Sequence, residues 1–557
     1  MAETIFIGVA WPYANGPLHL GHAAGCYLPA DIFARFHRAR GNDVLMVSGS
    51  DQHGTPITVQ AEAEGTTPAE VVRRYHTGFL ESWPKLGITW DLFTTTGTEN
   101  HAQVAHDFFS RLLEQGYIFR DTMQALKCPK CNRFLPDRYV DGTCPHCGDK
   151  SARGDGCDNC GKPLNAEELV DPRCRICGTT PALFATEHCF LDLSKFSDRL
   201  AEWVARQEHW KPNVITFTKN FIESGLRPRP ITRDINWGIT VPVAGFESKR
   251  IYVWFENVIG YLSASKEWAK AQGEPDLWRK WWSEPARSYY FIGKDNIFFH
   301  TLSWPAMLMG YGGLLMPYDV PANEHLTLER RPLSTSRRWA IWLDDFLTRY
   351  DADSLRYVLS INMPESADTD FSWQEFVRRN NDELVATYGN FVNRVLSFTA
   401  REFDGRVPEP GNLADADKAF LDRASTAFQS VTDHLAHCRF RAAIGEAMTL
   451  AQEGNRFLEG RAPWHAIRQN RSDAATSLHT AIQVISALKT MMYPFLPFSS
   501  ERLHRMLGLD GTLGKNDWAV APVPAGTPLR SPEPLFKLLE DSVASEELAR
   551  LRQAARE

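Results

Sequence analysis

"TIFIGVAWPYANGPLHLGH", residues 4–22, decides the fold of this chain. It begins with a short apolar run, Ile5 to Ala10, typical of a buried strand, and the Pro, Asn and Gly of WPYANGP (11–17) end that strand. A helix is predicted from about Gly21 to a stop at Gly41, and Pro29 predicts a kink within it. The stretch therefore indicates a strand, a polar loop and a helix in succession.

Two histidines flank the start of the predicted helix. His19 and His22 lie beside backbone amides that are free at a helix N-terminus, where the helix dipole also favours negative charge. Imidazole N–H groups would add directed donors, so we interpret the pair as a phosphate site. An H-x-x-H pair can also bind a metal ion or belong to an ordinary surface, and the residues alone leave both alternatives open.

Two further segments repeat the change from apolar strand to polar loop. They are DVLMVSGSDQHG (43–54) and SYYFIGKDNIFFH (288–300), the second with Gly293, Lys294 and Asp295 at the change. Each alone could be an ordinary turn between a strand and a helix. Together the three segments predict an α/β fold with a Rossmann-type parallel sheet, whose loops converge on one site at the carboxyl ends of the strands.

Size and composition favour an ordinary globular protein of several domains. The chain has 557 residues, 43% of them hydrophobic and 23% charged, and its formal net charge of -7 excludes a general basic footprint. The N-terminus lacks the basic start and apolar core of a signal peptide, and no run of 18 or more apolar residues occurs. We expect a cytoplasmic protein with no membrane span.

Eight of the eleven cysteines form four C-x-x-C pairs, beginning at Cys128, Cys144, Cys157 and Cys174. Pairs with this spacing are typical of zinc knuckles, in which four thiolates surround one Zn(II), so two ions are expected. A redox role or simple packing is the alternative. The spacing allows the four pairs to combine sequentially or in a nested arrangement.

Several sequence motifs of this chain resemble those of a known enzyme family. PYANGPLHLGH is similar to the HIGH signature of class I aminoacyl-tRNA synthetases, and most of the chain resembles the methionyl-tRNA synthetase family. The matching segments are SDQHGTPI (50–57), FLPDRYVDGTCPHC (134–147), RIYVWFENVIGY (250–261), FIGKDNIFFHTLSWPAM (291–307), DADSLRY (351–357) and NRFLEGRAPW (455–464).

The resemblance implies a Rossmann-type catalytic domain split by a zinc-knuckle insertion and followed by a helical bundle that binds the anticodon. The expected halves of the catalytic domain are residues 1–119 and 231–323, with the connective insertion at 120–230. A stem-contact region should occupy 324–375 and the helical domain with its tail 376–557. No appended tRNA-binding domain is recognised, so a monomer is expected.

The implied reaction joins L-methionine to ATP, giving methionyl-adenylate and pyrophosphate, and then transfers methionine to tRNA(Met). ATP would arrive with Mg(II). The positions that match ATP-binding residues of the family are Asn15, Gly16, His19, Gly21, His22, Gly293 and Asp295. The positions that match methionine-binding residues are Trp11, Tyr13, Asp51, Trp254, Tyr261 and His300.

Two residues depart from the family pattern near the methionine positions. Trp11 stands where many members have leucine, and Asn257 stands where a small residue is common. A reshaped apolar wall could change selectivity over analogues, since one methylene discriminates by only about 1–3 kcal/mol.

The resemblance also bears on the cysteines and on the helical last third. Members with one zinc use the positions of Cys144, Cys147, Cys157 and Cys160, which favours the nested arrangement with a second, outer zinc on Cys128, Cys131, Cys174 and Cys177. Both ions would be structural, because four thiolates leave no open position. In the helical domain Asn390, Arg394 and Trp464 match residues that read the anticodon.

One further segment differs from the family pattern more than Trp11 and Asn257 do. RRPLSTSRR (330–338) aligns with the mobile KMSKS loop of the family, but both lysines are missing and Thr335 replaces the one tied to the chemistry. We expect the loop residues Ser334, Thr335, Ser336, Arg337 and Arg338 to border ATP, with the arginines substituting for lysine.

The missing lysines keep other functions open. The chain could be a paralogue that has lost aminoacylation and acts as a tRNA-binding or regulatory protein, although the intact HLGH and Asp51 argue against this. A class I enzyme for leucine, isoleucine or valine is disfavoured, since the insertion has no room for a large editing domain.

Overall fold

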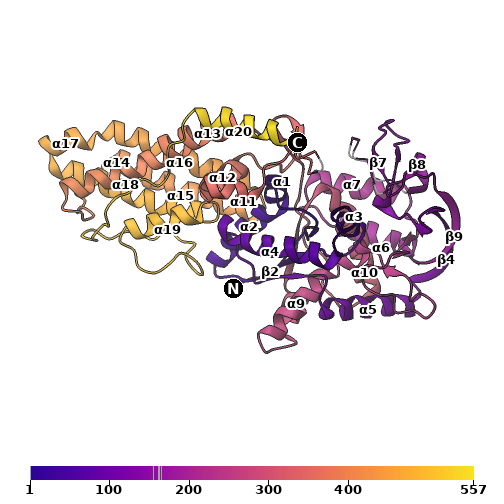
Figure 1. Cartoon of the computed structure of the whole chain (residues 1–557). Helices are drawn as coiled ribbons and strands as arrows, with labels where there is room; N and C mark the ends of the chain where they lie inside the picture. The colour runs from indigo at the N-terminus through magenta and orange to yellow at the C-terminus, as the bar shows by residue number, and fades with distance from the viewer. Residues whose placement is uncertain are drawn as a thin grey trace.

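The structure is a computed structural model that describes residues 2–154, 156–157, 159–160, 164, 166–335 and 337–556. Ser336, one of the predicted loop residues, lies outside them. Figure 1 shows an elongated molecule, with the cysteine-bearing insertion at one end, the parallel sheet in the middle and the C-terminal helices at the other end. No described helix is long and apolar enough to cross a membrane.

The central sheet has five parallel strands in the order β14-β13-β1-β2-β3. The strands are β1 (Thr4–Val9), β2 (Asp43–Ser50), β3 (Leu92–Thr95), β13 (Arg287–Gly293) and β14 (Ala322–Asn323). The chain winds outward from β1 through β2 to β3 and later, on the other side of β1, from β13 to β14. A crevice for ligands is expected where the winding direction changes, between β1 and β13.

The predicted helix after β1 is present, with a change of pitch in its middle. It consists of α1 (Leu20–His22), a π-helical turn η1 (Ala23–Tyr27) and α2 (Leu28–Ala39). Pro29 lies in the first turn of α2, directly after the π-helical turn. Since proline has no N–H for the i→i−4 bond, the wider turn accommodates it where a regular helix would kink.

Further helices cover the sheet and continue the catalytic half of the chain. They are α3 (Thr55–Glu64), α4 (Pro68–Leu86), α5 (Glu99–Glu114), α8 (Val253–Asn257), α9 (Gly260–Ala271), the π-helical turn η7 (Phe299–Ser303) and α10 (Trp304–Tyr311). The apolar side chains of the strands lie in two clusters, one on each side of the sheet.

The insertion is built on a long antiparallel ribbon of β4 (Ile118–Cys128) and β9 (Ala182–Leu191). At its far end is a small sheet of β7 (Ala152–Arg153), β6 (Val140–Thr143) and β8 (Val170–Cys174). The C-x-x-C pairs that begin at Cys144, Cys157 and Cys174 lie in or after these strands. The chain returns through α6 (Ser197–Ala205) and α7 (Pro212–Glu223).

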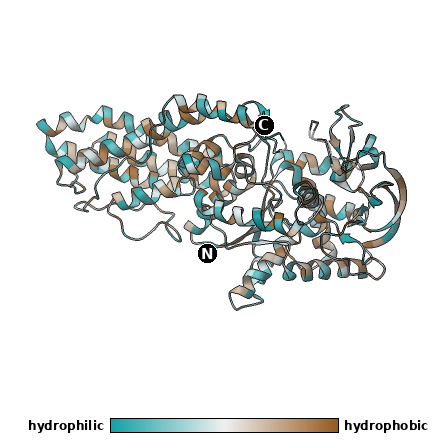
Figure 2. Cartoon of the chain, in the orientation of Figure 1, coloured by the Kyte–Doolittle hydropathy of each residue, from teal (hydrophilic) through white to brown (hydrophobic). Residues whose placement is uncertain are grey.

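The C-terminal part begins with a three-stranded sheet of β16 (Arg331–Pro332), β15 (Leu326–Leu328) and β17 (Thr369–Phe371), and with α11 (Leu343–Arg349) and α12 (Ala352–Ile361). The helical bundle follows, as α13 (Trp373–Arg378), the π-helical η8 (Arg379–Gly389), α14 (Asn390–Glu402), α15 (Asp415–Ala436), α16 (Phe440–Arg461), α17 (Pro463–Gln469), α18 (Arg471–Met492), α19 (Pro497–Met506) and α20 (Ser542–Ala554). Figure 2 shows hydrophilic and hydrophobic residues alternating along these helices, which is typical of amphipathic helices packed around a common core.

Candidate active site

His19 and His22 form a compact pair at the start of α1. The His19 ring accepts a hydrogen bond from the Gly21 amide at 3.1 Å, and the His22 ring accepts one from the His19 amide at 3.1 Å, in both cases through Nδ1. The two rings are stacked with centroids 3.8 Å apart. The capping arrangement therefore holds both imidazoles in one orientation.

These imidazoles are neutral at neutral pH. Burial and the neighbouring His22 lower the pKa of His19 well below its usual value, and burial lowers the pKa of His22 to about 4. Because Nδ1 of each ring is an acceptor, the remaining proton lies on Nε2. Each ring thus offers one N–H donor to an anionic ligand while adding no positive charge.

The described residues of the loop, 331–335 and 337–339, lie next to the helix start that carries this pair. Leu333 packs on Gly21, where a Cβ atom would come within 2.6 Å of the Leu333 Cδ1 methyl. Backbone bonds continue the contact, from Leu20 N to Ile341 O at 3.1 Å and from Leu343 N to Leu18 O at 2.8 Å. The segment predicted to act on phosphate therefore contacts the helix start that carries the histidine pair.

Within that loop the arginines differ in their surroundings. Ser334 and Trp339 exchange backbone hydrogen bonds of 3.0 and 2.9 Å, which close a tight hairpin. The Arg331 guanidinium lies 5.0 Å from the centre of the Trp339 ring. Arg337 and Arg338 are exposed, as is Thr335, and neither arginine side chain pairs with an acidic residue in the described part of the chain.

The other predicted nucleotide residues lie on neighbouring loops. Asn15 and Gly16 form the partly exposed turn after β1, and no atom lies within 4 Å of the position a Gly16 Cβ would take. Gly293 ends β13, and Asp295 pairs with His325 Nε2 at 3.0 Å. The structure therefore brings the loops after β1 and β13 to the crevice expected between these strands.

Asp51 is buried at the end of β2 and belongs to the same crevice. Its backbone pairs with the loop after β1, through Ala14 N to Asp51 O at 2.9 Å and Asp51 N to Pro12 O at 2.8 Å. The carboxylate accepts hydrogen bonds from the His53 amide at 3.2 Å and from Asn257 Nδ2 at 2.8 Å. Burial and the nearby Glu256 raise the pKa of Asp51 well above its usual value, so a bound cation would stabilise its charged form.

Next to Asp51 lies a network of buried polar side chains that the sequence did not predict. Glu256 is fully buried, contacts His53 Nδ1 at 2.7 Å and also pairs with His101, whose Nδ1 lies 2.8 Å from Ser263 Oγ. Burial opposes ionisation of Glu256, but His53 and His101 hold its pKa below the usual value. His53 and Glu256 stand inside two recognised motifs, whereas nothing in the sequence around His101 indicates its role.

Aromatic side chains form one wall of the crevice. Tyr13 meets Trp254 edge-on with centroids 5.9 Å apart, and Trp254 stacks on Phe299 at 4.5 Å. The Tyr261 hydroxyl lies 2.7 Å from His300 Nε2, and His300 Nδ1 lies 2.9 Å from the Asn296 carbonyl oxygen. Burial lowers the pKa of His300 to about 4, so the neutral ring donates to Asn296 and accepts from Tyr261.

The Trp11 side chain does not belong to this aromatic wall. It is buried between Gly49 and Gly260, where added Cβ atoms would come within 2.4 and 2.8 Å of its indole. The large residue at position 11 is therefore accommodated by two glycines beneath the crevice. Phe299, which completes the aromatic wall, was not among the predicted residues, although it lies in a recognised motif.

Comparisons with known proteins agree with this geometry. The family model described as "tRNA synthetases class I (M)" matches residues 5–396, and that described as "Anticodon binding domain of methionyl tRNA ligase" matches residues 407–555. The methionine–tRNA ligase of Dehalococcoides mccartyi (strain ATCC BAA-2266 / KCTC 15142 / 195) is 58% identical over 551 residues, covering 99% of this chain and 100% of the relative. The chain belongs to the methionyl-tRNA synthetase family.

Other members of the family support the same assignment. The methionine–tRNA ligase of Thermomicrobium roseum is 54% identical over 584 residues, with 100% of both chains covered. The crystal structure of Mycobacterium tuberculosis methionyl-tRNA synthetase bound by methionyl-adenylate superposes with a TM-score of 0.81 at 26% identity, covering 96% of this chain and 100% of that one. The predicted fold class and family are thus confirmed.

As in the nested arrangement, the knuckle cysteines of this family member form two groups of four. One group is Cys128, Cys131, Cys174 and Cys177, and the other is Cys144, Cys147, Cys157 and Cys160. Neighbouring sulfurs lie 3.5–3.9 Å apart. A tetrahedron with Zn–S bonds of about 2.3 Å has edges of about 3.8 Å, so both groups fit Zn(II), whereas a disulfide needs about 2.0 Å.

The residues predicted to read the anticodon lie together at the far end of the bundle. Asn390 and Arg394 are one turn apart on α14, and the Arg394 guanidinium lies 4.7 Å from the centre of the Trp464 ring. Ala462 has φ 40°, which sharply turns the chain from α16 into α17 just before Trp464. Asn390 Nδ2 donates to Asn455 Oδ1 at 3.1 Å, which fixes its amide.

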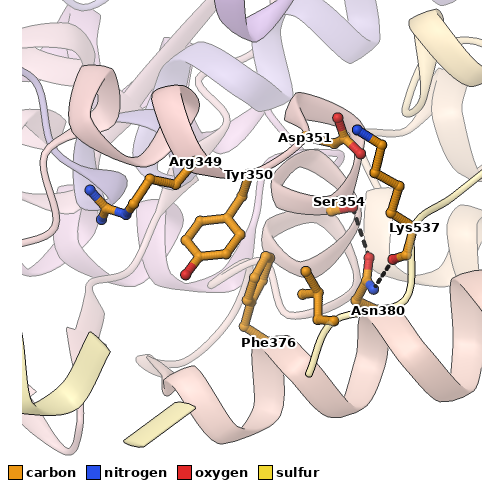
Figure 3. A pocket seen from close by; sticks show the side chains of 8 residues that line it. Arg349, Tyr350, Asp351, Ser354, Phe376, Asn380 and Lys537 are labelled. Atoms are coloured by element: carbon orange, nitrogen blue, oxygen red, sulfur yellow. Dashed lines mark hydrogen bonds between the residues drawn. The ribbon is translucent and has the colours of Figure 1, made fainter. Parts of the chain in front are cut away.

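A cavity of about 70 Å³ lies away from the crevice between β1 and β13, among α12, α13 and the C-terminal tail. Ser354 donates to Asn380 at 2.8 Å, and Asn380 donates to the Lys537 carbonyl oxygen at 2.9 Å. Figure 3 marks both hydrogen bonds with dashed lines. None of the predicted site residues lines it. Because the polar groups that line it form hydrogen bonds with one another, we interpret the cavity as part of the packing contact between the C-terminal tail and the helical bundle.

Proposed function

We propose specific roles for these residues in the methionine–tRNA ligase reaction to which family membership assigns the chain. The Nε2–H groups of His19 and His22 would donate to the phosphates of ATP, while Gly293 and Asp295 would border its adenosine. Support comes from the proton positions, since both rings present donors on Nε2. Neutral donors stabilise charge that moves from the α-phosphate to pyrophosphate without holding the product too firmly.

Methionine would lie in the crevice between Asp51 and the aromatic wall. Among the described residues, the Asp51 carboxylate accepts hydrogen bonds from neutral donors only, so the substrate ammonium would be its cationic partner. Tyr13, Trp254, Tyr261 and His300 would surround the thioether, which contacts aromatic rings favourably. The methionine carboxylate would then attack the α-phosphorus, and a terminal tRNA hydroxyl would take the aminoacyl group from the adenylate. Positioning and charge stabilisation suffice, and no covalent enzyme intermediate is needed.

The loop arginines would replace the missing lysines. The single observation that supports this proposal is the contact of Leu333 in the loop with Gly21, the residue between His19 and His22. Arg331 lies on Trp339, whereas Arg337 and Arg338 are exposed and have no acidic partner in the described ranges. A guanidinium binds phosphate through two parallel hydrogen bonds, so either residue could hold the departing pyrophosphate.

The metal ions would have separate tasks. Zn(II) on the two four-cysteine groups would hold the end of the insertion together, since four thiolates leave no position for substrate. Mg(II) would accompany ATP and neutralise part of the phosphate charge. At the far end of the bundle, Asn390, Arg394 and Trp464 would contact unpaired anticodon bases of tRNA(Met). A monomeric state and a cytoplasmic location stay predictions.

Pyrophosphate exchange into ATP tests the proposal. We expect exchange that depends on methionine among a panel of amino acids, and a loss of about tenfold or more in Arg337→Ala or Arg338→Ala. Arg331→Ala is the control within the same loop, since this side chain is engaged with Trp339. Full exchange in both variants would contradict the role of the arginines, and no exchange in the parent enzyme would favour a tRNA-binding paralogue.

A further inference from the structure

Lys211 carries a cation at a position where local physical chemistry disfavours one. It is the N-cap residue of α7, its side chain makes no capping hydrogen bond, and the partial positive charge of a helix N-terminus is unfavourable for an ammonium group. Burial lowers the pKa of Lys211, although the acidic Glu365, Asp319 and Glu324 nearby oppose this effect. Because neither the helix nor the burial favours a lysine, its presence is explained by what the ammonium contacts.

The ammonium of Lys211 contacts the edge strand of the parallel sheet. Its Nζ donates to Asn323 Oδ1 at 2.9 Å and to the Ala322 carbonyl oxygen at 3.4 Å, and both acceptors belong to β14. Asn323 is buried and lies level with Gly293 on β13, where the predicted nucleotide loop begins. Lys211 thus ties the connective insertion to the carboxyl edge of the sheet.

Asn323 connects Lys211 with the helix that carries the histidine pair. Its Nδ2 donates to the Ala24 carbonyl oxygen at 3.1 Å. If the amide turned by 180°, its nitrogen would face the ammonium and its oxygen would face the Ala24 oxygen, so both hydrogen bonds would be lost. Lys211 therefore selects the one orientation of the Asn323 amide that bonds Ala24.

Ala24 belongs to the π-helical turn η1, which begins directly after His22. Such turns are rare within helices, and the bond from Asn323 supports this one from outside the helix. The direction in which His19 and His22 present their Nε2–H groups depends on where this turn begins. Catalysis by positioning is sensitive to shifts of about 1 Å, so a contact that fixes η1 bears on the reaction.

We propose that Lys211 is a positioning residue for the activation of methionine: its ammonium orients Asn323, which holds η1 and keeps the two Nε2–H donors in place for ATP. Lys211 acts through Asn323 and does not itself contact the substrates. The proposal rests on the proposed function, because it concerns donors that the proposed function assigns to the phosphates.

Lys211→Met tests the proposal, with Lys219→Met as the matched control. Methionine keeps most of the length of the side chain but cannot donate, and Lys219 is an exposed lysine on the same helix. In Lys211→Met we expect kcat of methionine-dependent pyrophosphate exchange to fall by about tenfold or more, with KM for methionine within about twofold of the parent. Lys211→Arg, which can donate again, should recover part of the loss, and Lys219→Met should exchange at the parental rate.

A double variant separates positioning from a general loss of stability. Asn323→Ala removes the acceptor of Lys211 and the donor to Ala24 together, so adding Lys211→Met to it should cause no further loss of exchange. Parental kcat in Lys211→Met, losses that add in the double variant, or equal losses in Lys211→Met and Lys219→Met would overturn the proposal. No exchange in the parent enzyme would instead contradict the proposed function.

Discussion

Leu333 lies directly on Gly21, with its Cδ1 methyl 2.6 Å from the position that a Cβ atom on Gly21 would take. The same Cβ would come within 2.9 Å of the His19 ring. Gly21 therefore lets the loop 331–339 approach the histidine pair, and no other residue type fits without moving one of these side chains.

Gly21→Ala should consequently impair activation of methionine. We expect the added methyl to displace Leu333 and to tilt the His19 ring, so that pyrophosphate exchange falls by tenfold or more while thermal stability changes by only about 1 kcal/mol. Gly25→Ala is the control in the same helical segment, because no atom lies within 4 Å of its Cβ position. Equal exchange in both variants would show that the contact does not matter for the reaction.

Asn257→Ala should weaken methionine binding and shift its pH dependence. Asn257 donates to the Asp51 carboxylate at 2.8 Å, and this bond lowers a pKa that burial and Glu256 raise. A hydrogen bond to a charged group contributes about 1.5–3 kcal/mol, so KM for methionine should rise about tenfold or more. Because the charged carboxylate binds the ammonium, affinity falls as Asp51 becomes protonated.

The sign of that shift separates the proposed role from simple packing. Without the Asn257 donor the pKa of Asp51 moves further upward, so the acid limb of kcat/KM for methionine should move to higher pH. A variant with higher KM but an unmoved acid limb would contradict the proposed role. Exchange assays between pH 5 and 8 measure both quantities, and the KM for ATP serves as the internal control.

The sequence predicted those features that depend on neighbouring residues. The apolar run of β1, the histidine pair and the loop over it follow from local pattern and motif. By contrast, Glu256 meets His101 from 155 residues away, so neither flanking sequence contains the information. The spacing of the cysteine pairs is compatible with both arrangements. The pairing of β4 with β9, in which Lys127 faces Ala182, brings the outer pairs together. Nothing in the sequence indicated that the Arg331 guanidinium lies over the Trp339 ring, a contact made where the hairpin closes.

Zinc content should distinguish the two groups of cysteines. In the nested arrangement Cys128 and Cys174 belong to the same group. Cys128→Ser with Cys174→Ser removes two of its four ligands, so we expect elemental analysis to find one zinc per chain in place of two. Cys26→Ser with Cys438→Ser is the control, since neither residue belongs to a group, and it should retain both ions. Loss of both ions in the first variant would contradict the nested assignment.

His37 should make the catalytic half sensitive to acid. It is buried against Phe33 and Phe36, and burial lowers its pKa from 6.5 to about 3. The unfolded chain therefore takes up a proton below pH 6.5 that the folded chain excludes, so stability is present above that pH and falls as the pH drops toward 3. At pH 5 the loss from this residue is about 2 kcal/mol.

Urea unfolding at pH 7 and pH 5 measures that contribution. His37→Gln keeps an acceptor for Asn42, whose Nδ2 lies 2.8 Å from His37 Nδ1, but it cannot be charged. We expect the variant to lose less stability than the parent between the two pH values, by about 2 kcal/mol. Parallel losses in both proteins would assign the acid sensitivity to other groups.

Arg356 should contribute strongly to the packing of the catalytic helices against the bundle. Its fully buried guanidinium donates to Asp31 Oδ2 on α2 at 2.7 Å, to the Leu86 carbonyl oxygen at 3.2 Å, and to the carbonyl oxygens of Pro494 and Phe495 at 2.8 and 2.7 Å. Arg356→Met would leave Asp31 less compensated in the interior and should cost about 3–5 kcal/mol of unfolding free energy.

Two comparisons test whether the cost comes from the buried charge. Arg378→Met removes an exposed arginine that pairs with Glu375 and Glu383, and such pairs contribute only about 0–1 kcal/mol. Adding Asp31→Leu to Arg356→Met removes the charge left behind, so the double variant should be more stable than Arg356→Met alone. Unfolding of Arg356→Met and Arg378→Met at the same urea concentration would show that the four hydrogen bonds of Arg356 do not stabilise the contact between the catalytic helices and the bundle. The stability of that contact would then come from the surrounding apolar residues.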